Sequence, residues 1–162
     1  MKNYLVLLFC LFSGAAFAST FADSSATGLP SVTEQEYLLY TQGKDFGLGN
    51  IAEQSNYPSP ENVLQMASKL GINAVQKREL TKIQQEKQRK SLEMGKFIME
   101  QEAKFNDLFK GNKINEGSLV FYTNKIGLLQ GELRNAILKA HYQTWKLLTV
   151  SQLKKYQSLR KN

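Results

Sequence analysis

The chain has 162 residues, of which 42% are hydrophobic, and its formal net charge is +7. This length is enough for one domain with a hydrophobic core, and the positive charge favours acidic partners without identifying one. A single cysteine excludes an intramolecular disulfide framework, and a single histidine excludes the HExxH zinc pattern.

Residues 1–18, MKNYLVLLFCLFSGAAFA, have the three parts of a secretory signal peptide. Lys2 supplies the positive start, an apolar run follows, and Ala16 and Ala18 form a small-x-small cleavage site. The apolar run is too short to span a membrane as a mature helix. We therefore expect a soluble exported protein that begins near Ser19. Cleavage would remove Cys10 and Lys2, leaving a net charge of +6 and no cysteine. Without a recognition motif, we expect no nucleic-acid partner for an exported chain.

Residues 19–57 predict a flexible leader followed by an arm that packs on the main body. Small and polar residues dominate positions 19–31. Residues 33–40 predict a short helix capped by Thr33, with Glu36 reaching back to it. Glycines then interrupt the chain, and residues 51–54 predict one helical turn. The glycine-rich segment 43–49 lacks the strand–loop–helix context of a phosphate-binding loop.

Residues 58–162 predict the helical domain. Ser59 is a good N-cap, Pro60 suits the first helical position, and Gly71 suits a left-handed helix end. Asn73 and Gln76 form a capping box that opens a helix running to Lys110.

Two further helices complete this domain. One runs from residue 115 or 116 to residue 147 or 148, and Thr149 and Gln152 form a second capping box before a last helix to about residue 160. No strand pattern is convincing. The predicted fold is therefore all-α, a long helical hairpin with flanking short helices.

Apolar seams predict how the two long helices pack. The expected helix that begins at residue 115 or 116 carries a heptad seam suited to an antiparallel neighbour, formed by Leu119, Tyr122, Ile126, Leu129, Leu133, Ala136 and Ala140. The expected helix that ends at Lys110 has apolar edges at Leu80, Ile83, Met94, Phe97, Ile98, Phe105, Leu108 and Phe109. Between them, residues 84–90 contain no apolar side chain, so core burial alone cannot hold this stretch.

A row of alternating charges runs along the helix that ends at Lys110: Glu79, Lys82, Glu86, Arg89, Glu93, Lys96 and Glu100. Pairs at spacings of three and four each stabilise a helix by roughly 0.2–0.5 kcal/mol. The weak centre also suggests a partner helix from a second subunit.

Catalytic and metal sites find little support in the residues. A zinc site needs three or four ligands, and His141 is the only histidine, so we interpret it as a helix-surface or interface residue, with a metal role as the weaker alternative. No serine lies in a GxSxG context. We expect no enzyme activity and no cofactor. Tyr142 and Trp145 are interpreted as core anchors for the last helix, with an aromatic ligand site as the alternative.

The two capping boxes stand at matching places after Leu-rich stretches, LGINAVQ at 70–76 and LLTVSQ at 147–152. The second is a full LTxxQ motif, and in the first Ile-Asn replaces Leu-Thr. With the signal peptide and the helical body, these motifs resemble the Spy/CpxP family of bacterial periplasmic proteins, over roughly residues 46–159. Gly47-Leu48-Gly49 and Tyr57-Pro58-Ser59-Pro60 also look like a leader found in relatives described as refolding chaperones.

The resemblance implies a bent helical hairpin, a homodimer with a basic concave face, and a periplasmic stress protein that holds unfolded or partly folded clients without ATP. We expect client contacts at Lys82, Lys87, Arg89, Lys90, Met94, Lys96 and Phe97. Lysines would attract acidic clients over a Debye length of about 8 Å, and apolar side chains would add burial. The alternatives are a metal-responsive sensor or scavenger and an adaptor that docks an envelope-stress sensor protein. Metal-binding relatives use several histidines, whereas this chain has only His141, and this difference disfavours the sensor alternative.

Overall fold

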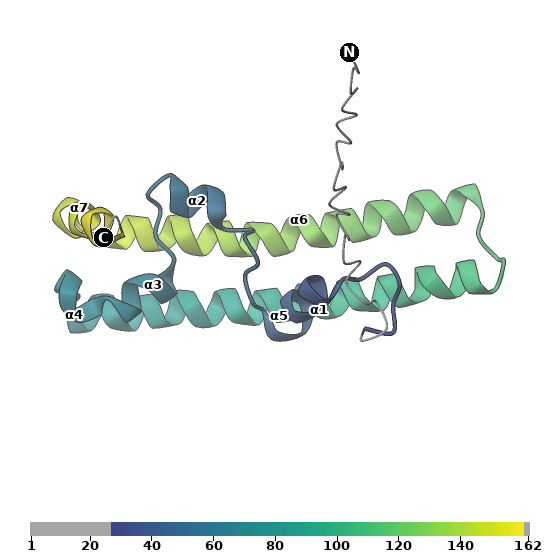
Figure 1. Cartoon of the computed structure of the whole chain (residues 1–162), viewed down its shortest axis with the longest axis horizontal. Coiled ribbons are helices and arrows are strands. Elements are labelled where there is room, and N and C mark those ends of the chain that lie inside the picture. Colours follow the sequence, from purple (N-terminus) through teal and green to yellow (C-terminus); the bar gives the residue numbers. More distant parts are fainter. Residues whose placement is uncertain (1–26, 161–162) are drawn as a thin grey trace, which may run out of the picture.

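Two long helices form the body of the molecule. The computed structural model describes residues 27–160, so the expected signal peptide and the start of the leader lie outside the described residues. α5 (Ala74–Lys110) and α6 (Glu116–Leu147) lie side by side as an antiparallel hairpin closed by residues 111–115 (Figure 1). The described residues contain helices and no strand, which confirms the predicted all-α fold.

The predicted capping boxes set the helix starts. Asn73 Oδ1 accepts a hydrogen bond from the Gln76 backbone N–H at 2.8 Å, and Gln76 Oε1 accepts from the Asn73 N–H at 3.2 Å. Thr149 and Gln152 make the same reciprocal bonds at the start of α7 (Val150–Arg160). Both predicted capping boxes are confirmed.

The structure also joins the two boxes to each other, which their sequence spacing does not reveal. Gln76 Nε2 donates to Gln152 Oε1 at 2.9 Å, and Gln152 Nε2 donates to Gln76 Oε1 at 3.0 Å. Gln76 Nε2 also donates to the Leu147 carbonyl, and Gln152 Nε2 to the Gly71 carbonyl. The side-chain amide pair thus fastens the start of α5 to the end of α6 and the start of α7.

Four short helices precede the hairpin: α1 (Glu34–Gln42), α2 (Asn50–Gln54), α3 (Pro60–Gln65) and α4 (Ala67–Leu70). The cap of α1 by Thr33 and Glu36 and the cap of α3 by Ser59 are as predicted. The expected helix over 60–70 is divided at Met66, whose backbone angles depart from helical values. Gly71 ends α4 with a positive φ of 66°.

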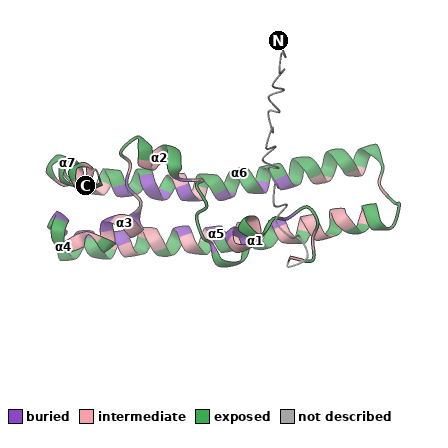
Figure 2. Ribbon diagram, in the orientation of Figure 1, coloured by how far each residue is buried: buried purple, intermediate pink, exposed green. Residues whose placement is uncertain are grey.

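α1 packs closely against the middle of α5. A Cβ at Gly95 would collide with the backbone carbonyl of Tyr40, so the absence of a side chain there permits the contact. Val32, Leu39 and Tyr40 join one core with Ile98 of α5 and with Leu129, Leu133 and Ile137 of α6. The arm and the hairpin therefore share a hydrophobic core, seen as the buried positions of Figure 2.

A second core lies at the other end of the hairpin, where Val63, Leu70, Leu80, Leu148 and Tyr156 are buried together. The interpretation of Tyr142 and Trp145 as core anchors is wrong, because both rings are exposed and stack on each other. Tyr142 lies two residues before the buried Thr144, about 200° around the helix. Tyr156, 1% exposed, anchors α7 instead.

Glu53 joins α2, α3 and α7. Its carboxylate accepts hydrogen bonds from the Tyr156 hydroxyl (3.0 Å), the Asn62 side-chain amide (2.8 Å) and the Ser59 backbone N–H (2.8 Å). Arg160 forms an ion pair with it at 3.4 Å. Burial raises the pKa of the Tyr156 hydroxyl to about 12, and the charge of Glu53 acts in the same direction.

This raised pKa predicts a loss of stability in alkali. The unfolded chain releases the Tyr156 proton near pH 10 and the folded chain only near pH 12. Unfolding in this pH range therefore releases a proton, and a higher pH favours the unfolded state. The free energy of unfolding should fall between pH 10 and pH 12, by about 2 kcal/mol more in the wild type than in Tyr156→Phe. Urea unfolding across this pH range measures the difference. Parallel pH curves for the two proteins would contradict it.

The predicted seams hold in the centre of the hairpin and fail at its closed end. Ile126, Leu129, Leu133 and Ala140 are buried as expected, and Leu119 is exposed. Of the apolar edge of α5, Leu80 and Ile98 are buried, and Phe97 and Phe109 are exposed. The core ends where the arm stops covering the hairpin. Beyond it no side chain is fully buried between the two helices, although the rings of Phe105 and Tyr122 stack across them.

Candidate functional site

The predicted client-binding residues all lie on α5, and the structure brings together only some of them. Lys87, Lys90 and Met94 line a groove of about 230 Å³ between α5 and α6, which we call the α5–α6 groove. The rest of its lining on α5 is Ile83 and Glu86, and on α6 it is Glu132, Asn135, Ala136, Lys139, Ala140 and Gln143. Glu86 is nine residues from Gly95, half a turn around α5, so the groove opens away from α1.

Lys87 differs most from its expected role. Its side chain is 9% exposed, and its ammonium group lies 2.7 Å from the Glu61 carboxylate of α3. We expected Lys87 to contact clients. In the structure α3 covers this position and supplies its counter-ion, so the ammonium group has little surface left for such a contact. This ion pair ties the stretch 84–90, which lacks apolar residues, to α3.

The other charged side chains of this part of α5 are half-buried or exposed. Ion pairs link Lys82 to Glu79 (2.8 Å), Arg89 to Glu86 (2.8 Å) and Glu93 (3.0 Å), and Lys90 to Glu93 (3.1 Å). The hydrogen bond from Arg89 lowers the pKa of Glu86, and the charges of Lys90 and Lys139 act in the same direction. A hydrogen bond from Lys90 lowers the pKa of Glu93. Lys96 and Phe97 are exposed outside the groove.

Lys139 is the positively charged residue of the groove that the sequence analysis missed, and the polar residues Glu132, Asn135 and Gln143 were missed with it. Lys139 follows Ala136 by three positions on α6, so it borders the predicted seam on the same side of the helix. Charged residues next to an apolar seam are the signal that would have found it.

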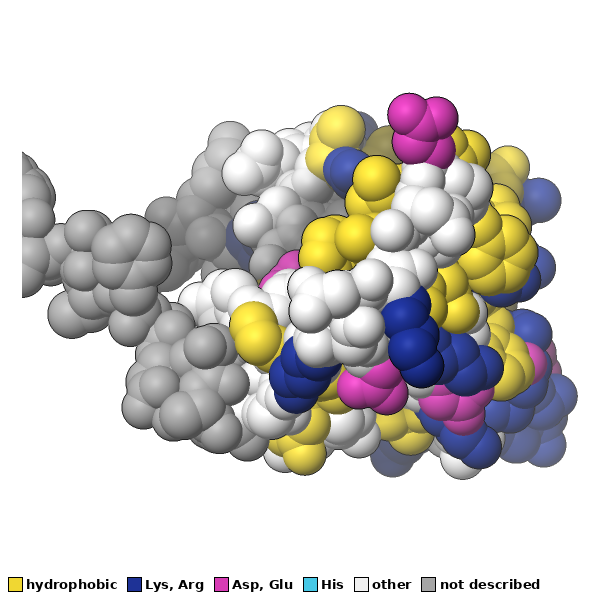
Figure 3. Space-filling view, turned by 90° about the vertical axis from the view of Figure 1, so that its right-hand side faces the viewer, with side chains coloured by type: hydrophobic (Ala, Val, Ile, Leu, Met, Phe, Trp, Pro, Cys, Tyr) yellow, Lys and Arg dark blue, Asp and Glu magenta, His cyan; other side chains and the backbone are white. Residues whose placement is uncertain are grey.

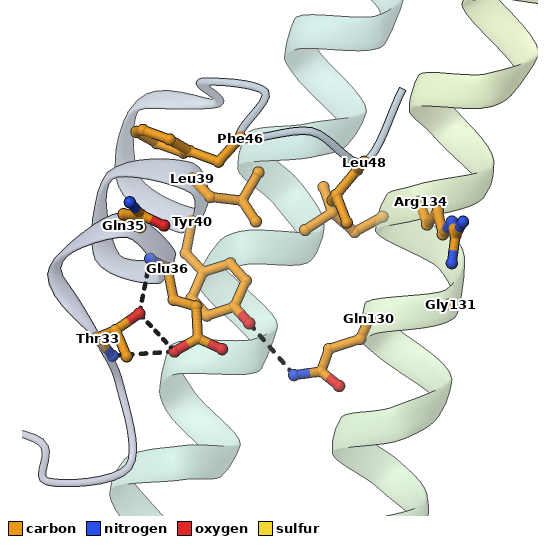
Figure 4. A pocket seen from close by; sticks show the side chains of 11 residues that line it. Thr33, Gln35, Glu36, Leu39, Tyr40, Phe46, Leu48, Gln130, Gly131 and Arg134 are labelled. Carbon is orange, nitrogen blue, oxygen red and sulfur yellow. Dashed lines mark hydrogen bonds between the residues drawn. The ribbon is translucent and has the colours of Figure 1, made fainter. Parts of the chain in front are cut away.

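A larger pocket, of about 580 Å³, lies between α1, the loop before α2 and α6 (Figure 4). Leu39, Leu48 and Leu133 give it apolar walls, and the Gln130 amide donates to the Tyr40 hydroxyl at 3.2 Å. Its lining holds both the Glu36 carboxylate and the Arg134 guanidinium, so its charge does not favour one sign of ligand. The sequence analysis placed no site here, because the pocket exists only once the arm has docked.

The closed end of the hairpin carries an exposed apolar surface, which we call the tip patch: Phe109, Leu119, Val120, Phe121 and Leu128. Figure 3 looks onto this end, where hydrophobic side chains lie beside basic side chains, with a few acidic ones among them. No side chain among residues 99–125 is buried.

His141 is not the surface or interface residue that we expected. It is 2% exposed, and its Nδ1 lies 2.8 Å from the Tyr57 carbonyl oxygen. Since a carbonyl only accepts, Nδ1 carries the proton, and Nε2 faces Gly49 and Asp45. The part of the chain that the structure describes contains no group of three or more His, Cys, Asp or Glu residues able to hold a metal ion.

Comparison with known proteins yields no match to a family model, to a curated protein or to a solved structure. Among residues 27–160, no helix has the length and apolar character needed to cross a membrane.

Proposed function

We propose that this chain is an ATP-independent chaperone-like stress protein that binds unfolded or partly folded polypeptides in the α5–α6 groove. The observation that carries the proposal is the composition of the groove. Ile83, Met94 and Ala136 give it apolar contacts. Its charged lining is Lys87, Lys90 and Lys139 together with Glu86 and Glu132, so three positive and two negative side chains leave a net charge of +1. A partly unfolded chain presents apolar segments and carboxylates, which are the complementary features.

The exposed part of α5 extends the same chemistry beyond the groove. Lys96 and Phe97 are exposed next to each other, and Leu92 is an exposed apolar residue one turn away. Many weak contacts of this kind allow a client to dissociate without a nucleotide cycle. The LTxxQ motif and the signal-like residues 1–18 support an exported, periplasmic location, and the resemblance supports a homodimer.

The test is suppression of aggregation, measured by light scattering, for several thermally unfolding proteins at stoichiometric amounts of the chain. We expect delayed aggregation, and we expect Lys90→Gln/Lys139→Gln to raise the concentration needed for half protection about fivefold, since each exposed charge pair contributes about 0.5 kcal/mol. The matched control is Lys154→Gln/Lys155→Gln, which removes two exposed lysines from α7.

Two outcomes would count against the proposal. The wild-type chain could fail to delay the aggregation of every protein tested, which would remove the chaperone activity. Alternatively, the groove and control variants could lose protection equally, which would leave only a general effect of charge.

A further inference from the structure

The tip patch belongs to a part of the hairpin that has no core of its own. Ile98 is the last buried residue of α5, and Ile126 is the first of α6. From Ile98 to Lys110, α5 extends about 18 Å at 1.5 Å per residue. Residues 99–125 nevertheless include many large apolar side chains, which the chain itself leaves half-buried or exposed.

Aromatic rings connect this surface across the two helices. The ring of Phe105 lies 5.1 Å from that of Phe109 and 5.4 Å from that of Tyr122 of α6, which in turn lies 5.1 Å from the ring of Phe121. Val120, Phe121 and Leu128 are 60%, 58% and 60% exposed and line a shallow open hollow. The apolar surface is therefore continuous from the end of α5 to the outer side of α6.

Four exposed lysines lie in the same part of the hairpin, Lys104, Lys110, Lys113 and Lys125, and Lys125 borders the hollow directly. The acidic residues between positions 104 and 125 are Asp107 and Glu116, so four positive and two negative charges give this end a net charge of +2. None of the four lysines forms an ion pair with another described residue.

We propose that the tip patch binds an anionic lipid surface, with its rings at the boundary between headgroups and acyl chains and its lysines on the headgroups. Exposed Phe and Leu side chains flanked by lysines have the chemistry of interfacial membrane binding. A second copy on this patch would bring the same excess of lysines face to face. A peptide would find no walls at the closed end of a two-helix hairpin, whereas a lipid surface adapts to a projecting tip.

The experiment uses tryptophan fluorescence of the full chain with vesicles that contain brominated lipid. In Phe121→Trp/Trp145→Phe the only tryptophan reports on the tip, and in the wild type Trp145 reports on the opposite end of α6. With vesicles of phosphatidylcholine and phosphatidylglycerol, we expect a blue shift and quenching at position 121 and little quenching at position 145. Residues 1–18 are the same in both proteins, so any membrane binding by them cannot produce this difference.

The contribution of the lysines to vesicle binding is tested in the background of Phe121→Trp/Trp145→Phe. Lys110→Gln/Lys113→Gln should require about thirtyfold more lipid for half quenching, since each lysine near an anionic surface strengthens binding about fivefold. Lys154→Gln/Lys155→Gln on α7 should leave the titration unchanged. Salt should weaken quenching, because the Debye length shortens.

Several results would overturn the proposal. One is equal quenching at positions 121 and 145, and another is equal quenching by purely neutral vesicles. A third is a change of oligomeric state on Phe121→Ser without any vesicle binding at the tip, which would identify a contact between copies. Loss of aggregation suppression on Phe121→Ser without vesicle binding would identify a client surface. The groove variant Lys90→Gln/Lys139→Gln should keep its vesicle binding, so failure of this proposal and failure of the proposed function are distinguishable.

Discussion

Gln76→Ala is expected to lower the free energy of unfolding by about 2–3 kcal/mol, an unusually large effect for a helix-capping residue. The Gln76 side chain accepts from the Asn73 N–H and donates to the Leu147 carbonyl, and it exchanges two hydrogen bonds with the Gln152 amide. Gln76 is buried, so its removal leaves polar groups without partners where water has poor access. The loss therefore exceeds that of an ordinary cap.

Urea unfolding followed by circular dichroism measures this loss. Gln85→Ala, at an exposed position of the same helix, is the matched control and should change stability by less than about 0.5 kcal/mol. In a double-mutant cycle, the loss of stability in Gln76→Ala/Gln152→Ala should be smaller than the sum of the two single losses by about 1 kcal/mol or more. Strict additivity would mean that the two capping boxes stabilise their helices independently.

Glu61→Ala is expected to cost about 2–3 kcal/mol, whereas Lys87→Met should change stability by less than about 1 kcal/mol. Removing Glu61 leaves the ammonium group of Lys87 buried without its counter-ion, which lies 2.7 Å away in the wild type. Methionine instead keeps much of the length of the lysine side chain and removes the charge. Glu61 is more exposed than Lys87, so its carboxylate can be hydrated when the lysine is gone.

The double variant Glu61→Ala/Lys87→Met should recover most of the stability lost in Glu61→Ala. Glu79→Ala breaks the exposed pair with Lys82, serves as the control, and should cost less than about 0.5 kcal/mol. Equal losses for Glu61→Ala and Lys87→Met would show that the pair contributes as an attraction between solvated charges.

The local rules of helix formation determined most of the helix boundaries. Thr33, Ser59, Asn73 and Thr149 each cap the helix that was expected after them, because a side-chain oxygen at this position satisfies a free backbone N–H whatever the rest of the chain does. The division at Met66 was not predictable from such rules.

The candidate site was predicted only in part. Lys90 and Met94 line the α5–α6 groove as part of a charged and apolar surface, whereas Lys87 is covered by α3 and Lys139 was missed. Periodicity along one helix indicates which residues share a face, but it does not indicate which neighbouring element covers that face. For the same reason Tyr142 and Trp145 were placed in a core that Tyr156 occupies.

By itself the amino-acid sequence determined the all-α class, the two long helices and the residues that cap them, since these depend on contacts within a few positions of the chain. Only the tertiary structure decided that Gln76 meets Gln152, that Glu61 neutralises Lys87, and that the apolar end of the hairpin remains uncovered. These features join residues that are far apart in sequence or depend on where the arm stops, and burial is set by the elements that pack together in space.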